Sequence, residues 1–93
     1  MIIVSGRLYI QQGQREAFVS ESARAVTTAR QTEGCRDFVV AADPVDRDRV
    51  NVYEEWESAE TLLAFRGAGP GDDLSALIVR ADVQEYEAVP RTV

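Results

Sequence analysis

The chain has 93 residues, the length of one small domain, so we expect a single domain over residues 1–93. It contains no histidine and one cysteine, which excludes a Ser-His or Cys-His catalytic dyad, an intrachain disulfide and the usual structural zinc sites. The formal charge of −6 disfavours nucleic-acid and anionic-membrane partners, and no apolar run is long enough to span a bilayer.

The first half of the sequence predicts a strand, a helix and a second strand. Residues 2–10 alternate apolar and other side chains with the period of a half-buried strand. Residues 14–32 place apolar and small side chains three and four positions apart, which predicts an amphipathic helix. Gly34 lies where a helix C-terminal glycine is common, and residues 35–42 alternate again.

The second half opens with a hairpin and a capped helix. Residues 43–48 form a polar turn with a proline near its start, and residues 49–57 alternate as a third strand. The short link predicts that this strand and the preceding one pair in antiparallel fashion. Ser58 is expected to cap a second helix.

The remaining residues predict a break, a short helix and a last strand. Glycines at 67–71 interrupt the second helix, and an aspartate at 72–73 is expected to cap a short helix. Three apolar side chains at i, i+3 and i+4 spacing support that helix: Leu74, Leu77 and Ile78. Residues 81–89 are predicted to form the fourth strand.

The order β-α-β-β-α-β is that of a ferredoxin-like α+β domain, a four-stranded antiparallel sheet with both helices on one face. The opposite sheet face would carry Ile3, Val39 and Tyr53, or the alternating residues beside them, and an uncovered apolar face favours a homodimer. Because the N-terminus lacks a basic start followed by a long apolar stretch, we expect a cytoplasmic protein. Cys35 would then stay reduced, as a small core residue.

Three segments together resemble the antibiotic biosynthesis monooxygenase family. Residues 53–56, Tyr-Glu-Glu-Trp, are similar to the family's strand that ends Tyr-Glu-x-Trp and runs into a capped helix. Residues 33–35, Glu-Gly-Cys, resemble its entry to the second strand, and residues 81–87 resemble its closing strand. The resemblance covers nearly the whole chain.

The resemblance implies a dimeric α+β barrel in which each pocket lies between a sheet and its own helices. The family includes cofactor-free oxygenases that turn phenolic or quinol-type rings into quinones, quinol monooxygenase-like proteins and haem-degrading relatives. Many relatives, haem degraders among them, place a histidine about where Phe65 stands here, so haem degradation is disfavoured. Cofactor-free members offer an asparagine near the tryptophan, whereas Asn51 lies on the strand face opposite Trp56.

The candidate catalytic residues are Trp56, Glu54 and Asn51. Trp56 would stack on a planar ring and donate its N–H to a substrate oxygen, or it is a core residue under the second helix. Glu54 shares the face of Trp56, as a pocket acid or base or as the partner of an arginine. Asn51 enters through the resemblance, and structural hydrogen bonding is its alternative role.

The candidate substrate-binding residues come from both helices and from two strands. Three apolar residues are expected to line a pocket between helices and sheet, or to pack there without a ligand: Phe18, Leu62 and Phe65. Tyr86 could donate to a substrate oxygen, although a half-buried strand tyrosine usually packs. Arg7 could hold a substrate oxygen, or pair with Asp37 or Glu54.

Two functions follow as hypotheses. The first is a cofactor-independent monooxygenase that oxidises a quinol-like or polycyclic phenolic aromatic with O₂, the electron-rich substrate reducing the oxygen itself. The sequence has no dinucleotide-binding or metal-ligand motif, so no cofactor and no metal are expected. The second is a non-catalytic homodimeric module that binds a small hydrophobic ligand.

Overall fold

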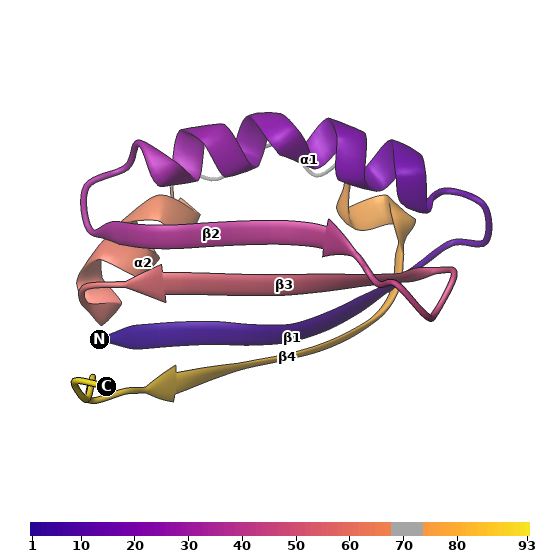
Figure 1. Cartoon of the computed structure of the whole chain (residues 1–93). Coiled ribbons are helices and arrows are strands. Elements are labelled where there is room, and N and C mark those ends of the chain that lie inside the picture. The colour runs from indigo at the N-terminus through magenta and orange to yellow at the C-terminus, as the bar shows by residue number, and fades with distance from the viewer. Residues whose placement is uncertain (68–73) are drawn as a thin grey trace.

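The computed structural model describes residues 1–67 and 74–93 (Figure 1). The elements follow in the order β1 (Ile2–Ile10), α1 (Arg15–Arg30), β2 (Cys35–Ala42), β3 (Arg49–Trp56), α2 (Ala59–Gly67), the 3₁₀ turn η1 (Ser75–Leu77) and β4 (Ile78–Glu87). This is the predicted ferredoxin-like β-α-β-β-α-β arrangement, and the prediction is confirmed. No helix among the described residues has both the length and the apolar character needed to cross a membrane.

The four strands form one antiparallel sheet in the order β2-β3-β1-β4. In Figure 1, α1 runs along β2 and α2 lies behind the strands, near the start of β1. Ser58 caps α2 as predicted, because its Oγ accepts a hydrogen bond from the Thr61 N–H at 3.3 Å. We call the sheet face away from the helices the open face.

The core consists of two clusters along the helix-facing side of the sheet. One, under α2, contains Val4, Trp56 and Leu62. The other, near the start of α1, contains Ile10, Phe18 and Val50. The strand residues of both clusters belong to the alternating sets that the sequence placed on one face, because period-two alternation sends every second side chain to the same side.

The C-terminal part differs from the prediction. β4 starts at Ile78, three residues before the expected position, and the predicted helix is only the 3₁₀ turn η1. Ile78 pairs with Ile10, and the Gln11 N–H donates to the Leu77 carbonyl at 2.9 Å, so strand pairing overrides the helical spacing. The three apolar residues still pack on the second cluster, as their spacing suggested. The predicted aspartate cap at 72–73 lies outside the described residues.

Gly34 serves a turn and not a helix end. α1 ends at Arg30, and Gly34 adopts a φ of +87° in the turn that leads into β2. Its carbonyl accepts the Glu57 N–H at 2.8 Å, and a Cβ at this position would lie 2.7 Å from Thr61 Oγ1. The missing side chain therefore lets this turn pack against the first turn of α2.

We expect Gly34→Ala to lower the free energy of unfolding by about 2–4 kcal/mol, from a left-handed backbone and a collision with α2. Gly13→Ala is the matched control, because Gly13 has a φ of +80° but no atom within 4 Å of its would-be Cβ. That control should cost only about 1–2 kcal/mol. Urea unfolding followed by circular dichroism measures both, and equal losses would contradict the proposed contact with Thr61.

Candidate active site

A carboxylate and an indole form a pair on the helix-facing side of β3. Trp56 Nε1–H donates a hydrogen bond to Glu54 Oε1 at 2.9 Å. The two residues are two positions apart in one strand, so alternation places them on the same face, as predicted. Trp56 is fully buried, and its N–H is used within the protein. This arrangement matches the alternative of a core tryptophan under the second helix.

Glu54 lies in a row of side chains that crosses the whole sheet. Its Cα partners are Phe38 on β2 and Val4 on β1, and Val4 in turn pairs with Glu85 on β4. Above the β4 end of this row, Arg66 Nη1 of α2 binds Glu85 Oε2 at 3.0 Å. Sequence reasoning missed Arg66 and Glu85, because strand alternation shows which face Glu85 occupies but not which strand it adjoins.

Burial makes the Glu54 carboxyl a weaker acid than a solvent-exposed glutamate. The pKa of its carboxyl is raised above the ordinary value, chiefly by burial and also by the charge of Glu85, while the Trp56 hydrogen bond and the Arg66 charge oppose the rise. The pKa of the nearby Cys35 thiol is raised as well, by burial and then by the Glu54 charge. Glu54 is therefore suited to proton transfer, whereas Cys35 is unsuited to act as a thiolate nucleophile.

Three aromatic rings close the site on the α2 side. The Phe65 ring lies 5.2 Å from the Trp56 ring at an interplanar angle of 38°. It meets the Phe38 ring edge-on, at 5.8 Å and 62°. Phe65 is thus packed against the tryptophan that binds Glu54, at the position where relatives with a histidine would present a polar ring.

A cavity of about 730 Å³ lies beside these rings, between α1 and α2. It is lined by Glu21, Arg24, Ala25, Thr28, Thr32, Glu33, Glu60, Thr61, Ala64, Phe65 and Leu74. Phe65 is the one lining residue that the sequence had singled out as a site residue. The signal that could have found the α1 wall is the three- and four-residue spacing of Ala25, Thr28 and Thr32, which continues along the edge of the buried stripe of α1.

Phe18 and Leu62 are buried but do not line this cavity. Phe18 packs with Ile10 and Val50 in the second cluster, whereas Leu62 packs with Trp56 in the first. The 16 residues of α1 span about 24 Å, so its N-terminal end is far from α2. In this structure both residues make packing contacts.

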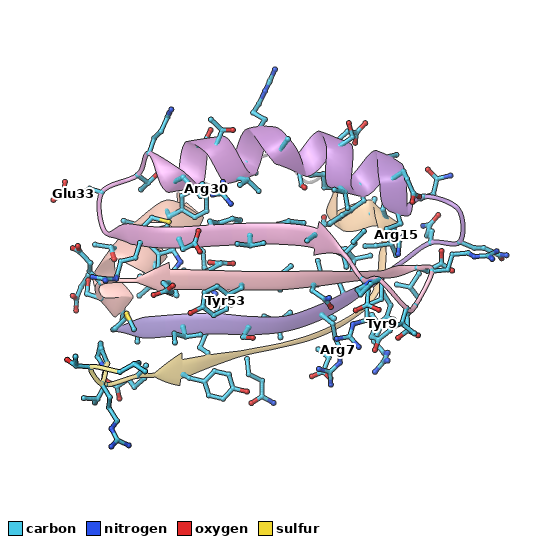
Figure 2. All side chains as sticks on the ribbon, in the orientation of Figure 1. Arg7, Tyr9, Arg15, Arg30, Glu33 and Tyr53 are labelled. Carbon is cyan, nitrogen blue, oxygen red and sulfur yellow. The ribbon has the colours of Figure 1, made fainter. Side chains whose placement is uncertain are left out.

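Arg7 and Tyr86 lie on the open face, away from Glu54. Arg7 Nη2 binds Asp82 Oδ2 at 2.6 Å, so its partner is neither Asp37 nor Glu54. Tyr86 pairs with Ile3 in the sheet and is 52% exposed. Figure 2 labels Arg7 with Tyr9 and Tyr53 on the strands that lie in front of α2. Strand alternation separates all of these side chains from the cavity.

Asn51 also belongs to the open face, where it supports the β2–β3 turn. Its Nδ2 donates to Asp43 Oδ1 at 2.9 Å, and its Oδ1 accepts from Arg49 Nε at 2.7 Å. The pKa of Asp43 is lowered to about 2, because the Asp46 N–H, the Asn51 amide and the Val45 N–H all donate to its carboxylate. Asn51 thus makes the structural hydrogen bonds that were its alternative role. Within residues 1–67 and 74–93, no cluster of acidic, cysteine or histidine side chains could hold a metal ion.

The fold and this site define a small α+β domain in which a half-buried carboxyl accepts a hydrogen bond from a buried indole next to an interhelical cavity. A family model described as antibiotic biosynthesis monooxygenase matches residues 1–70, about three-quarters of the sequence. The chain therefore belongs to the antibiotic biosynthesis monooxygenase family, as its motifs suggested. Comparison with curated proteins gives no match.

Solved structures carry the same fold over the full chain. A candidate antibiotic biosynthesis monooxygenase from Deinococcus radiodurans is 21% identical with a TM-score of 0.85, covering 100% of this chain and 97% of its own. One from Chloroflexus aurantiacus is 27% identical with a TM-score of 0.73, covering 99% and 96%. Another from Nitrosomonas europaea is 15% identical with a TM-score of 0.82, covering 97% and 100%. At identities this low, the similarity establishes the fold.

Proposed function

We propose that this protein is a cofactor-independent monooxygenase that oxidises a quinol-like or polycyclic phenolic aromatic with O₂. The proposal depends on one observation about Glu54. Its carboxyl is half-buried, has a raised pKa and accepts a hydrogen bond from the Trp56 indole N–H. Because its pKa is raised, this group binds a proton more readily than a solvent-exposed glutamate does, which suits it to accept and return a proton. The adjacent cavity, at about 730 Å³, has the size of pockets that hold molecules of several rings.

The proposed chemistry needs one base and one apolar pocket. The Glu54 carboxylate removes a proton from the ring system, and the resulting carbanion or phenolate donates electrons to O₂, which forms a carbon–oxygen bond as a peroxide. Glu54 returns its proton to the peroxide, then removes the hydrogen that remains on the oxygenated carbon as the O–O bond breaks, and passes that proton to the departing hydroxide. One oxygen atom remains as the quinone carbonyl, and the other leaves as water.

Phe65 has a defined part in this proposal. Its ring lines the cavity and also covers Trp56, whereas neither Trp56 nor Glu54 is among the lining residues. A substrate ring in the cavity therefore reaches Glu54 by displacing the Phe65 ring, a side-chain rotation that is fast compared with turnover. The displaced ring then shields the reacting atoms from water.

We further propose that the protein is a homodimer that buries its open face. Tyr53, Val39 and Ile3 are half-buried there, although no helix of residues 1–67 and 74–93 covers this side. Burying such a face stabilises a domain too small to form a large core. Tyr53→Asp is expected to shift the mass from dimer to monomer in light scattering after gel filtration. Glu57→Asp, at an exposed position after β3, is the control, and a monomeric wild type would contradict the proposal.

Oxygen uptake tests the proposed reaction. We expect purified, flavin-free protein to consume O₂ with a hydroquinone, a naphthohydroquinol or an anthrone, equally well with and without EDTA. The oxygenated quinone should appear in a 1:1 ratio to the O₂ consumed and without hydrogen peroxide, because the second oxygen atom leaves as water. Uptake no faster than the uncatalysed oxidation across the whole panel would overturn the monooxygenase proposal.

A non-catalytic module that binds a small hydrophobic ligand is the second candidate. It is favoured by the full burial of Trp56 and by the position of Glu54 outside the cavity lining. In that case an aromatic ligand should quench the fluorescence of the single tryptophan saturably, without oxygen uptake and without product. Quenching accompanied by quinone formation decides for the enzyme.

A further inference from the structure

The charges of Arg66 and Glu85 act on the Glu54 carboxyl, and these two side chains bind each other. Arg66, in the last turn of α2, contacts Glu85 at 3.0 Å. Val4 pairs with Glu54 on one neighbouring strand and with Glu85 on the other. The two carboxyl groups therefore lie on the same sheet face, on either side of Val4 and on the side of α2. The Arg66 guanidinium could pair with either carboxylate, and in the structure it pairs with Glu85.

The other elements packed around Glu54 contribute uncharged groups and one further cation. β1 contributes the apolar Val4, β2 contributes Phe38 and the thiol of Cys35, and the strand of Glu54 itself contributes the Trp56 N–H. α1 contributes Arg30, whose Nε donates to the Phe38 carbonyl at 2.8 Å and whose charge acts on Cys35. Arg66 from α2 and Glu85 from β4 are the charged groups whose fields act on this carboxyl. Its protonation is therefore governed by two residues that lie far from it in sequence.

We propose that Glu85 is a positioning residue for Glu54: by holding the Arg66 guanidinium over β4, it keeps that cation from pairing with Glu54, which stays available as the base. This inference rests on the proposed function for its catalytic meaning, but its electrostatic content can be measured without substrate. The Arg66 and Glu85 side chains are 44% and 53% exposed, so their ion pair by itself contributes little to stability.

The two partners have opposite expected effects on the Glu54 proton. In Glu85→Gln a negative charge disappears and Arg66 is released toward Glu54, so the carboxylate is favoured and protonation moves to lower pH. In Arg66→Gln the cation disappears while Glu85 remains, so protonation of Glu54 moves to higher pH. If Glu85 acts only through its own charge and does not hold Arg66, Glu85→Gln should lower the titration midpoint of Glu54 by the same amount in an Arg66→Gln background as in the wild type.

Trp56 reports the protonation state directly. It is the one tryptophan of the chain, and its Nε1–H donates to Glu54, so its indole ¹H–¹⁵N resonance should titrate with that carboxyl. We expect the midpoint to fall by about half a pH unit or more in Glu85→Gln and to rise by a similar amount in Arg66→Gln. Glu57→Gln and Arg36→Gln, which remove the same charges at exposed positions, should leave the midpoint unchanged.

Two results would overturn the inference. One is that the titration midpoints of Glu85→Gln and Arg66→Gln move in the same direction or do not move. The other is that the wild-type indole resonance shows no transition with pH. The acid limb of the rate profile on a hydroquinone, recorded for the same variants, should follow the resonance midpoints. If the midpoints shift in opposite directions but neither the wild type nor the variants consume oxygen, the role of Glu85 is supported and the proposed reaction is contradicted. If oxygen is consumed but the midpoints do not move, the reaction is supported and the role of Glu85 is contradicted.

Discussion

Glu54→Gln is expected to lower the turnover number on a quinol by about 100- to 10,000-fold, the usual contribution of a positioned general base. The amide has nearly the shape of the carboxyl, and its oxygen can still accept the Trp56 N–H, so the fold and the cavity should be retained. Single-turnover oxygen uptake with saturating substrate separates this loss of chemistry from a loss of binding. A variant that keeps a tenth or more of the wild-type rate would exclude Glu54 as the base.

The same substitution should stabilise the protein at neutral pH. Since the pKa of Glu54 is higher in the folded chain than its ordinary value of 4.5, the folded state holds more protons than the unfolded state above pH 4.5. Wild-type stability from this group is therefore full below pH 4.5 and declines as the pH rises through the folded pKa. Glu54→Gln removes the decline, so its advantage in urea midpoint over wild type should grow from pH 4 to pH 8.

Glu57→Gln is the control for both measurements, because it makes the same chemical change at an exposed position just after β3. It should alter neither the oxygen uptake nor the pH dependence of the urea midpoint. If the difference in urea midpoint between Glu54→Gln and wild type does not change with pH, then ionisation of the half-buried Glu54 carboxyl does not lower the stability of the folded state.

Trp56→Ala is expected to lower the free energy of unfolding by about 3–5 kcal/mol, the usual cost of removing a large buried ring. That is a large share of the 5–15 kcal/mol that stabilises a typical domain. Trp56 is fully buried and packs against Phe65, Val4 and Leu62, so the cavity left behind would collapse only in part. Circular dichroism in urea measures the loss, since the variant has no tryptophan to report it.

Trp56→Phe separates the packing of the ring from its hydrogen bond. It keeps an aromatic ring against Phe65 but removes the N–H that opposes the raised pKa of Glu54. Its acid limb in the rate profile should therefore move to higher pH, with a smaller loss of stability than in Trp56→Ala. An unmoved acid limb would mean that the indole N–H does not support the Glu54 carboxylate during turnover.

Much of this fold could be read from local patterns. Alternation over residues 2–10 and 49–57 identified two strands and put Glu54 and Trp56 on one face, because successive side chains of a strand point to opposite sides. Ser58 was identified as a cap from its hydroxyl, which satisfies a free N–H of the first helical turn. The family motifs added the expected sheet and helix arrangement, and the family match agrees with them.

Local patterns were ambiguous where one spacing suits two structures. Leu74, Leu77 and Ile78 have helical spacing, yet Ile78 opens β4 because it pairs with Ile10 of β1. Phe18 was grouped with Phe65, although the length of α1 places the two at different ends of the core. In both cases the deciding contact joins residues that are far apart in the chain.

The sequence by itself determined the order of elements and the face on which each strand residue lies, since these depend on neighbours along the chain. Only the tertiary structure decided that Glu85 comes to stand across Val4 from Glu54, that Arg66 lies above them, and that a cavity opens between α1 and α2. These features depend on sheet register and helix docking. Both are set by burial of apolar surface between distant segments, for which a local pattern carries no signal.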